Sequence, residues 1–434
     1  MNRRQFVVAT SAAAAAAASP ASSTAPVRSS PLQAGYWGSE FYDSEEQQQL
    51  SDVVNARSPF RWYGPQPPLK VATFERRFAE RLQTRFALAV TSGTAALQCA
   101  VNALEIGPGD EVILPAWTWH SCYAAIVLAG ALPVFAEIDE SFNLDPSDVE
   151  HRITPQTKAI MAVHLQGNPC DLDPVLAIAR KHKLRVIEDF AQSVGASYKG
   201  RPLGSMGDIG ICSLQLNKTI TAGEGGVVVT NDPVLFERAA RFHDVGMFRP
   251  VHQKVAGEQR LTPFVGTNFR MNEFSGGVLL AQLGKLDKII GNVRANARRV
   301  YDGIRDLPGI QMRRLPDPAG ELGTGVYIGF KTKDRCDRYK AAMKAENVPA
   351  TGPAGSAILP IQPYIEKKVT VHPAWPSFTS ERGRRIQYGA AACPRTIDIL
   401  SRFGGVLMDP KFTRRDTDDA IAAIRKVYPP VASA

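Results

Sequence analysis

The chain has 434 residues, of which 44% are hydrophobic and 21% charged, and its formal net charge is +9. This length is enough for a large domain and a smaller one, each with a buried core. The positive charge is mild for a chain of this size and is compatible with small anionic ligands. No dense Lys/Arg stripe with interleaved aromatic residues occurs, so no nucleic-acid partner is expected.

The N-terminus carries a separate signal. Paired arginines, Arg3 and Arg4, are followed by Phe6 and by an alanine-rich, mildly apolar stretch that ends near Ala18. The apolar run is too short for a membrane span and is typical of a twin-arginine export signal. Residues 1–32 are therefore predicted to be a signal and linker, cut between residues 16 and 25. The alternative is a solvated tail on a cytoplasmic protein.

Beyond the signal, strand and helix patterns alternate from Phe86 to about Phe242, with Pro and Gly between them. Such alternation predicts an α/β fold with a mostly parallel sheet between helices. A helix is predicted over residues 272–290. It ends a large domain of residues 33–290, and residues 291–434 are predicted to form a smaller α/β domain.

The first candidate site follows the predicted strand 86–90. Ser92, Gly93 and Thr94 open a helix that runs to about Leu104. Backbone amides at a helix start, with small hydroxyl side chains beside them, form an anion site that suits a phosphate. Gly93 and Thr94 are the candidates. The alternative is a simple helix cap.

The second candidate follows the predicted strand 111–114. The stretch from Pro115 to Trp119 contains Trp117 and Trp119, and it places an aromatic face where a flat ring could stack. Aromatic residues near strand ends are also common core residues.

The third candidate is a pair of carboxylates, Glu188 and Asp189, at the end of an apolar strand. Ligand-facing groups gather at the carboxyl ends of parallel strands, and side chains alternate along a strand, so only one carboxylate needs to face the site. A buried carboxylate there could keep a ring nitrogen protonated. We choose Asp189, with Gln192 as a hydrogen-bond donor three residues later. The alternative is a helix N-terminal signal.

The fourth candidate is Lys218, in a glycine-rich turn between the apolar run 208–214 and a strand over residues 227–230. Desolvation beside close-packed glycines lowers the pKa of a lysine and makes its amine nucleophilic toward an aldehyde or ketone. Ser213, five residues earlier, can add a hydroxyl to the phosphate site. The alternative is a solvated lysine in a hairpin turn.

Other polar residues give weaker indications. His164 and His120 lie close to predicted strand ends and could contact a substrate or be structural. The six cysteines show neither Cys-x-x-Cys pairs nor metal-ligand spacing with histidine, so no metal site is predicted. Cys99 and Cys212 lie in apolar runs and are expected to be buried thiols. An even count permits disulfides, but their scatter is typical of a cytoplasmic fold.

Taken in order, these segments resemble the DegT/DnrJ/EryC1/StrS sugar aminotransferase family, of fold type I among pyridoxal phosphate enzymes. The resemblance covers residues 35–428. It rests on motifs that occur in the family's order: Ser92-Gly93-Thr94-Ala95-Ala96-Leu97, residues 107–112, residues 163–167, Glu188-Asp189-x-Ala191-Gln192, Ser213-x4-Lys218, Gly223-x-Gly225-Gly226 and Asn268-Phe269-Arg270-Met271.

The resemblance implies a role for each candidate. Lys218 would hold pyridoxal 5'-phosphate covalently and later move a proton between cofactor and substrate. Asp189 would pair with the pyridine nitrogen, Gln192 with the phenolic oxygen, and Trp119 would stack on the ring. The phosphate would be held by Gly93, Thr94 and Ser213, and by Asn268 from the neighbouring subunit of a homodimer with shared active sites. Gln166 departs from the family pattern, which often has an aromatic residue there, and so does the stretch from Trp119 to Cys122.

The activity implied is transfer of an amino group from glutamate or glutamine to a nucleotide-linked keto-sugar or to a keto-cyclitol. The sequence around Lys218 and residues 392–400 favours the cyclitol and antibiotic-sugar branches. Two alternatives remain open. One is a sugar dehydratase or other pyridoxal phosphate activity on the same fold, although relatives with that chemistry tend to replace the lysine. The other is a non-catalytic, cofactor-binding regulator.

Overall fold

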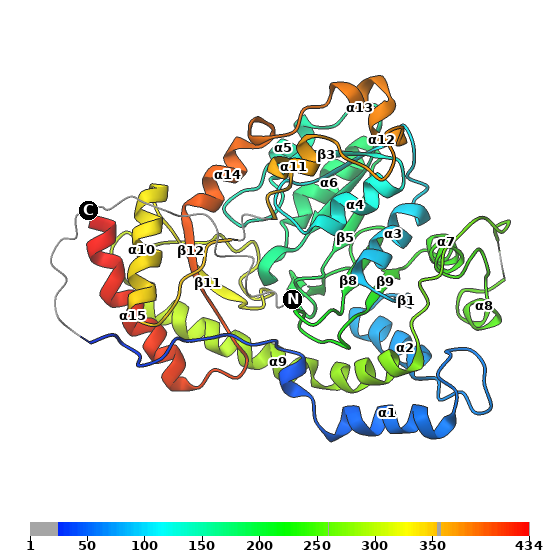
Figure 1. Ribbon diagram of the computed structural model, residues 1–434, viewed down its shortest axis with the longest axis horizontal. Helices are drawn as coiled ribbons and strands as arrows, with labels where there is room; N and C mark the ends of the chain where they lie inside the picture. Colours follow the sequence, from blue (N-terminus) through cyan, green and yellow to red (C-terminus); the bar gives the residue numbers. More distant parts are fainter. Residues whose placement is uncertain (1–24, 259, 354–356, 434) are drawn as a thin grey trace.

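Figure 1 presents the computed structural model, which describes residues 25–258, 260–353 and 357–433. The predicted export signal, with Arg3, Arg4 and Phe6, lies outside the described residues. Within these ranges no helix combines the length and apolar character that crossing a membrane requires.

The centre of the molecule is a seven-stranded sheet with the strand order β1-β9-β8-β5-β4-β2-β3. Strand β9 runs antiparallel to both of its neighbours, and the pairs from β8 to β3 are all parallel. The strands are apolar and almost wholly buried, as expected of a parallel sheet that is covered on its faces. The predicted mostly parallel, mixed sheet is confirmed. Its strands are β1 (Phe86–Val90), β2 (Glu111–Pro115), β3 (Leu132–Ala136), β4 (Thr157–Val163), β5 (Arg185–Asp189), β8 (Ile209–Ser213) and β9 (Gly226–Thr230).

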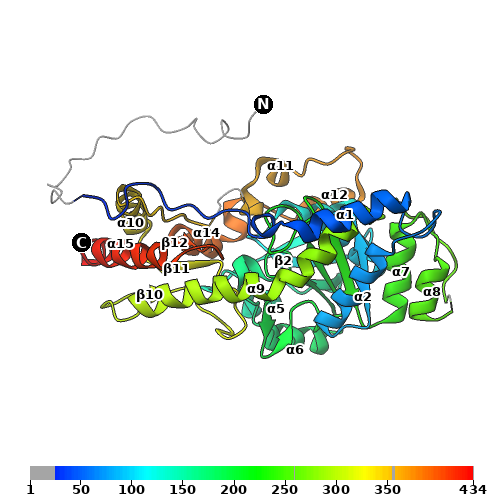
Figure 2. The same cartoon turned by 90° about the horizontal axis from the view of Figure 1, so that it is seen from below.

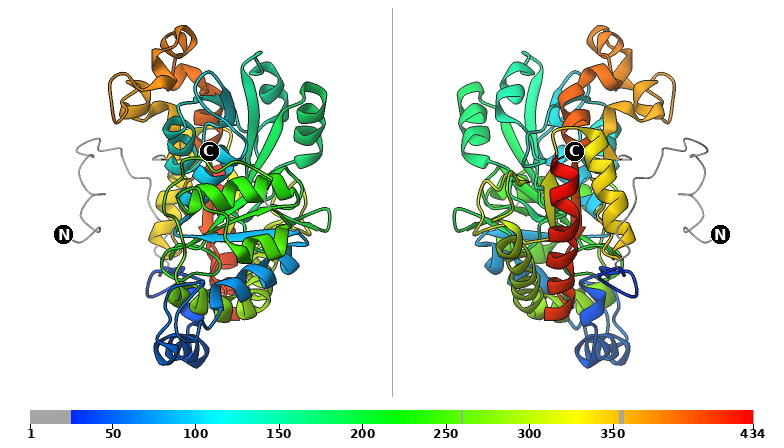
Figure 3. Two further views of the ribbon diagram at one scale, coloured as in Figure 1. Left: turned by 90° about the vertical axis from the view of Figure 1, so that its right-hand side faces the viewer. Right: turned by 90° about the vertical axis from the view of Figure 1, so that its left-hand side faces the viewer.

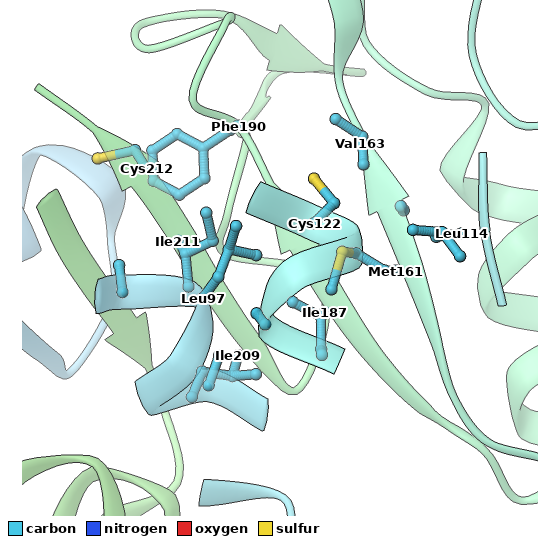
Figure 4. Packing of buried hydrophobic residues seen from close by; sticks show 14 of the residues in the cluster. Leu97, Leu114, Cys122, Met161, Val163, Ile187, Phe190, Ile209, Ile211 and Cys212 are labelled. Carbon is cyan, nitrogen blue, oxygen red and sulfur yellow. The ribbon is translucent and has the colours of Figure 1, made fainter. Parts of the chain in front are cut away.

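Helices pack on this sheet and supply the rest of the first hydrophobic core. Figure 4 shows Leu97 and Cys122 on their helices beside Ile187 and Ile211 of the strands. Proline and a capping aspartate mark several helix starts, such as Asp232 before Pro233. The helices are α2 (Lys70–Leu82), α3 (Gly93–Ala103), α4 (His120–Leu128), α5 (Pro146–His151), α6 (Leu172–His182), α7 (Pro233–His243) and α8 (Pro250–Ala256).

Helix α9 (Glu273–Ile304) is one continuous element of 32 residues, capped by Asn272, whose side chain accepts a hydrogen bond from the Ser275 amide at 3.0 Å. The predicted end at Ile290 was wrong, because apolar residues from Val293 to Ile304 continue the buried face. Figures 1 and 2 show α9 running from beneath the large sheet to the smaller part of the molecule.

A second hydrophobic core lies at the far end of α9. Its antiparallel sheet contains β10 (Gln311–Met312), β11 (Gly325–Gly329) and β12 (Phe403–Leu407). Helices α10 (Lys333–Ala345) and α15 (Arg414–Ser433) pack against each other beside it, as the right-hand view of Figure 3 shows.

The chain between β11 and β12 returns to the first core. Ile358, Leu359, Tyr388 and Leu400 all belong to that core. Because α9 also runs through residue 290, the boundary between residues 33–290 and 291–434 stays a prediction. The returning elements are η5 (Leu359–Ile361), α11 (Pro363–Glu366), α12 (Pro376–Thr379), α13 (Glu381–Arg385), η6 (Ala390–Ala392) and α14 (Pro394–Ser401).

The described chain begins with an extended segment, residues 25–38, that we call the N-terminal strap. It runs along the smaller part of the molecule, coloured dark blue in Figure 1, and leads into η2 (Ser39–Phe41) and α1 (Ser44–Ala56), which packs on α9. Three short elements complete the description: η3 (Leu165–Gly167), β6 (Ser197–Tyr198) and β7 (Arg201–Pro202).

Candidate active site

Two adjoining cavities open at the carboxyl ends of the central parallel strands, where α/β sheets place their ligands. The inner cavity has a volume of about 450 Å³ and the outer one about 470 Å³. Both are lined by Trp119, Gln192 and Lys218. The inner cavity is also lined by Gly93, Thr94, Asp189 and Ser213. Seven of the eight predicted site residues therefore meet in one place.

Lys218 lies in the turn that follows β8, where its backbone amide donates to the carbonyl of Gln215 at 2.9 Å. Burial lowers the pKa of the Lys218 amine, and the nearby charge of Asp189 opposes that shift. The turn is tightly packed, because a Cβ added to Gly226 would lie 2.3 Å from the carbonyl oxygen of Ser92. The position provides the partly desolvated amine that Schiff-base chemistry needs.

Asp189 ends β5 and is 4% exposed. Its Oδ1 accepts the backbone N–H of Ala191 at 2.9 Å, and its Oδ2 accepts the thiol of Cys122 at 3.2 Å. Burial raises the pKa of this carboxyl, although these hydrogen bonds and Lys218 oppose the rise. A cation placed at Oδ2 would offset the energetic cost of desolvation and keep the carboxylate ionised.

Glu188 points into a different polar cluster. One carboxylate oxygen lies 3.3 Å from Nε2 of His164 and accepts the Gly204 amide at 2.9 Å, while the other accepts the Met206 amide at 2.6 Å. Burial works against the charge, but the bonds to His164 and to backbone amides hold the pKa of Glu188 below its usual value. Of the two adjacent carboxylates, only Asp189 lines the inner cavity.

The start of α3 forms an anion cradle. Ser92 caps the helix by accepting the Ala95 amide at 3.0 Å, so its hydroxyl is occupied locally. A Cβ added to Gly93 would lie 2.6 Å from the Cβ of Ser213, so only glycine allows this close approach. The Thr94 and Ser121 hydroxyls are hydrogen-bonded at 2.7 Å. Backbone amides at the start of a helix, with hydroxyl side chains beside them, are the groups that bind a phosphate.

Gln192 is oriented by a neighbour. Its Oε1 accepts the backbone N–H of Gln166 at 3.0 Å, which leaves the amide nitrogen as the donor for a ligand. Gln166 itself has a φ of 52°. Its carbonyl accepts the hydroxyl of Thr324 at 2.6 Å, and its side-chain oxygen accepts the Tyr327 hydroxyl at 3.0 Å. Gln166 thus lines the outer cavity in a fixed orientation.

Trp119 lies between the two cavities and is 59% exposed. An exposed aromatic face in a cavity is suited to stack on a planar ring. His120 follows it, but Nδ1 of His120 lies 2.7 Å from the hydroxyl of Tyr364. Neither His120 nor His164 is among the residues that line the two cavities.

Asn268 does not line either cavity of its own chain. It is exposed, forms an isolated bridge with Asp244, and its Oδ1 accepts the Arg270 amide at 3.3 Å. Its predicted action on a neighbouring subunit stays a prediction.

Two residues of the site, Cys122 and Ser121, were not predicted from the sequence. Both belong to the first turn of α4, next to Trp119, and this stretch was noted only as a departure from the family pattern. All six cysteines are free and buried, including Cys99 and Cys212 as expected.

The residues fit pyridoxal phosphate, a group that combines an aldehyde, a flat pyridine ring and a phosphate. Lys218 can meet the aldehyde, Asp189 the ring nitrogen, Trp119 the ring face, and the Gly93 cradle the phosphate. Asp189 is the feature most specific for the ring, since its buried Oδ2 has only a weak thiol donor.

Comparison with known proteins agrees with this geometry. Residues 42–376 match the model of the DegT/DnrJ/EryC1/StrS aminotransferase family. GDP-perosamine synthase from Escherichia coli O157:H7 is 42% identical over 238 residues, which are 55% of this chain and 64% of that protein. L-glutamine:2-deoxy-scyllo-inosose aminotransferase from Streptomyces kanamyceticus is 40% identical over 309 residues, 68% of this chain and 72% of that protein.

The fold is also that of solved aminotransferases. The aminotransferase from Psychrobacter cryohalolentis superimposes with a TM-score of 0.76 at 28% identity, covering 92% of this chain and 100% of that one. The predicted resemblance and fold type are confirmed. The chain spans 57 to 64% of the length of two GDP-perosamine synthases that it matches.

Proposed function

Because the chain belongs to the DegT/DnrJ/EryC1/StrS aminotransferase family, we propose that it is a pyridoxal phosphate-dependent aminotransferase. It passes an amino group from glutamate or glutamine to the keto group of a sugar or cyclitol. The observation that carries the proposal is the meeting of Lys218, Asp189 and the Gly93 cradle in one cavity. A lysine without the carboxylate, or without the cradle, would not specify this chemistry.

Each residue has a distinct task. When bound, pyridoxal phosphate supplies a conjugated ring that accepts the electron pair left by proton removal from the substrate carbon. Asp189 keeps the proton on the ring nitrogen, and Gln192 donates a hydrogen bond to the phenolic oxygen. The Lys218 amine, freed when the substrate binds, takes the proton from one carbon and returns it to another. Backbone amides near Gly93, with Thr94 and Ser213, hold the phosphate.

The outer cavity is the proposed acceptor site. The aromatic residues Tyr36, Trp37 and Trp119 line it, together with Gln166 and Thr324; a fourth aromatic residue of the lining, Trp117, is 2% exposed and belongs to the first core. Aromatic faces pack on the C–H faces of sugar and cyclitol rings, while amides and hydroxyls bind their hydroxyl groups. A polyhydroxylated ring with one keto group matches this lining.

The names of the relatives support the proposed acceptor class, as does the lining of the outer cavity. The names of the relatives include a GDP-perosamine synthase and a 2-deoxy-scyllo-inosose aminotransferase. We propose a keto-cyclitol or an antibiotic-type keto-sugar, since the longer of these two alignments is to the inosose aminotransferase.

The test separates the two half-reactions. Purified protein loaded with pyridoxal phosphate is mixed with L-glutamate or L-glutamine, and loss of the visible absorption band reports the donor step. A panel of inososes and nucleotide-linked keto-sugars then reports the acceptor step by mass spectrometry of the product amine. Amination of one panel member is expected. Loss of water from the sugar without gain of nitrogen would favour a dehydratase, and no reaction with either donor would favour the regulator.

Two further parts of the proposal concern assembly and location. We propose a homodimer in which Asn268 of each chain reaches the phosphate site of the other, because Asn268 is exposed and so is Val265 in the same loop, at 91%.

We also propose export by the twin-arginine route, supported by Arg3, Arg4 and Phe6. That route carries folded proteins, which suits an enzyme that binds its cofactor before export.

A further inference from the structure

The N-terminal strap is anchored to the smaller part of the molecule at several points. The Arg28 guanidinium lies 2.9 Å from Asp416 and 2.7 Å from Asp419, both near the start of α15. The Val27 amide donates to the Glu346 carboxylate at 2.9 Å, and the Leu32 amide donates to the carbonyl of Asn347 at 2.8 Å. Leu32 is also 6% exposed and belongs to the second core. Residues 25–32, which were predicted to belong to the signal and linker, thus pack against the smaller part of the molecule.

The strap ends at the outer cavity. Ala34, Gly35, Tyr36 and Trp37 line it, together with Leu407 and Met408 at the end of β12. The Gly35 amide donates to the carboxylate of Asp409 at 2.6 Å, so the strap is tied down beside the cavity wall. The Glu40 carboxylate also packs against this point of the strap, because a Cβ added to Gly35 would lie 1.6 Å from Oε1 of Glu40.

The two aromatic residues of the strap differ in their surroundings. Trp37 packs against both hydrophobic cores, so its position is fixed by the fold. Tyr36 is 53% exposed although it lines a cavity. An exposed aromatic ring at a cavity wall leaves a face available for a ligand.

No strap residue lines the inner cavity, which holds Asp189 and the Gly93 cradle. The strap therefore contributes to the outer cavity alone. Changes in the strap are therefore expected to alter the binding of a bulky ring in the outer cavity, and not the binding of the cofactor.

We propose that Tyr36 and Trp37 are specificity-determining residues that form an aromatic wall of the acceptor site, and that the strap holds them in place through Arg28 and Gly35. This proposal rests on the proposed function, since it names residues of the same site. It assigns the strap to substrate selection: residues 25–38 are needed in the working enzyme for the ring-shaped acceptor, and much less for the acyclic amino donor.

The experiment uses the full chain loaded with pyridoxal phosphate and compares Tyr36→Ala with Tyr36→Phe. The donor step is measured with L-glutamine, and the acceptor step with 2-deoxy-scyllo-inosose or with the panel keto-sugar that gives the highest turnover. Loss of the ring in Tyr36→Ala should raise the acceptor KM roughly tenfold, the value of one aromatic packing contact. Tyr36→Phe keeps the ring and should stay within about twofold, as should the donor step in both variants.

A second pair of variants tests the anchor without touching the cavity. Arg28→Ala removes the bridge to α15 and should raise the acceptor KM roughly two- to fivefold, the value of a partly exposed ion pair. Arg414→Ala is the matched control, because Arg414 is an exposed arginine at the start of the same helix, 4.0 Å from Asp418. It should leave the acceptor KM unchanged. Melting temperatures and the absorption band of the bound cofactor are recorded for every variant.

The outcomes separate the proposals. An unchanged acceptor KM in Tyr36→Ala, or an equal loss in both steps together with a lower melting temperature, would overturn the role of the strap in specificity and leave the aminotransferase standing. A wild-type chain that takes no amino group from glutamine or glutamate would overturn the proposed function, and the acceptor role of the strap with it.

Discussion

Asp189 illustrates how one side chain is prepared for chemistry by its surroundings. Burial pushes its pKa up, while the Ala191 amide, the Cys122 thiol and the charge of Lys218 push it down. The carboxylate is therefore removed from solvent, and a protonated ring nitrogen would add a charged partner that favours its ionised form. Its neighbour Glu188 is already satisfied by His164 and backbone amides.

The first prediction concerns Asp189→Asn. The amide cannot hold a ring nitrogen protonated, so turnover should fall by about 10² to 10⁴ while the cofactor stays bound. Steady-state rates and the absorption spectrum of the variant provide the measurement. Glu188→Gln is the matched comparison: it should affect folding stability more than the spectrum of bound cofactor. Near-normal turnover in Asp189→Asn would remove Asp189 from the proposed chemistry.

The second prediction concerns the pH dependence of Lys218. Burial lowers its pKa, so the neutral, reactive amine should exist at a lower pH than for a solvated lysine, and reactivity should rise with pH through that lowered pKa. Competitive acetylation of the cofactor-free protein over a pH series, read by mass spectrometry against the exposed Lys254, measures it. In Asp189→Asn the pKa of Lys218 should fall further, because the charge of Asp189 opposes the shift. A rise in that variant would contradict the assignment of causes.

At the scale of elements, the site depends on how closely three segments approach. The start of α3 touches the end of β8 at Gly93 and Ser213, and it touches the start of β9 through Ser92 and Gly226. Glycine is needed at these contacts for space, because a side chain would push the helix start away from the strands.

The third prediction compares two helical glycines: Gly93, the first residue of α3, and Gly291, which lies within α9. Gly93→Ala should lower the melting temperature and weaken retention of pyridoxal phosphate, since overpacking costs roughly 1–3 kcal/mol and displaces the cradle. Gly291→Ala on α9 should raise stability by about 1 kcal/mol, because an added Cβ there meets no heavy atom within 4 Å and alanine favours the helix. Thermal unfolding and cofactor titration of both variants provide the readout. An equal response of the two would show that close packing at Gly93 is unimportant.

At the scale of the whole molecule, two parts of the structure are joined by α9 and by the strap, with the catalytic cavities between them. Asn268 does not line these cavities, so its predicted contact with the phosphate would come from a second subunit.

The fourth prediction tests shared active sites by complementation. Lys218→Ala and Asn268→Asp should each be inactive or strongly impaired, the second because a carboxylate repels the phosphate. When the two variants are co-expressed or refolded together, random pairing makes about half of the dimers mixed. In each mixed dimer one of the two sites has both native residues, so activity should return to about one quarter of wild type. Mixtures no more active than the parents would mean that Asn268 acts within its own chain or not at all.

The fifth prediction concerns location. Replacing Arg3 and Arg4 by lysine should leave an active enzyme in the cytoplasm, while the wild-type chain should be recovered outside the cytoplasmic membrane without roughly its first twenty to thirty residues. The strap adds a constraint: a cut beyond Arg28 would remove an anchor of the acceptor site. N-terminal sequencing of the recovered protein decides the cut, and a wild-type protein that keeps Met1 inside the cell would defeat the export proposal.

Several features of this protein were determined by local sequence alone. The strand Phe86–Val90, the glycine-rich turn with Lys218, and the strand end at Asp189 could be predicted because apolar runs, glycines and polar residues lie next to one another in the chain. Seven of the eight predicted residues lie in one cavity for a related reason. Each of their motifs lies at the carboxyl end of a strand, and a parallel sheet brings those ends together at one edge.

Other features were decided only by the tertiary structure. The continuation of α9 to Ile304, the use of Cys122 and Ser121, and the placement of Tyr36 at the outer cavity all depend on contacts between residues far apart in sequence. The apolar residues from Val293 to Ile304 continue the helical pattern in the sequence, but only the tertiary structure shows the second core against which they pack. The strap becomes a wall of the site because Arg28 and Gly35 bind carboxylates more than 370 residues away, and only folding brings such partners together.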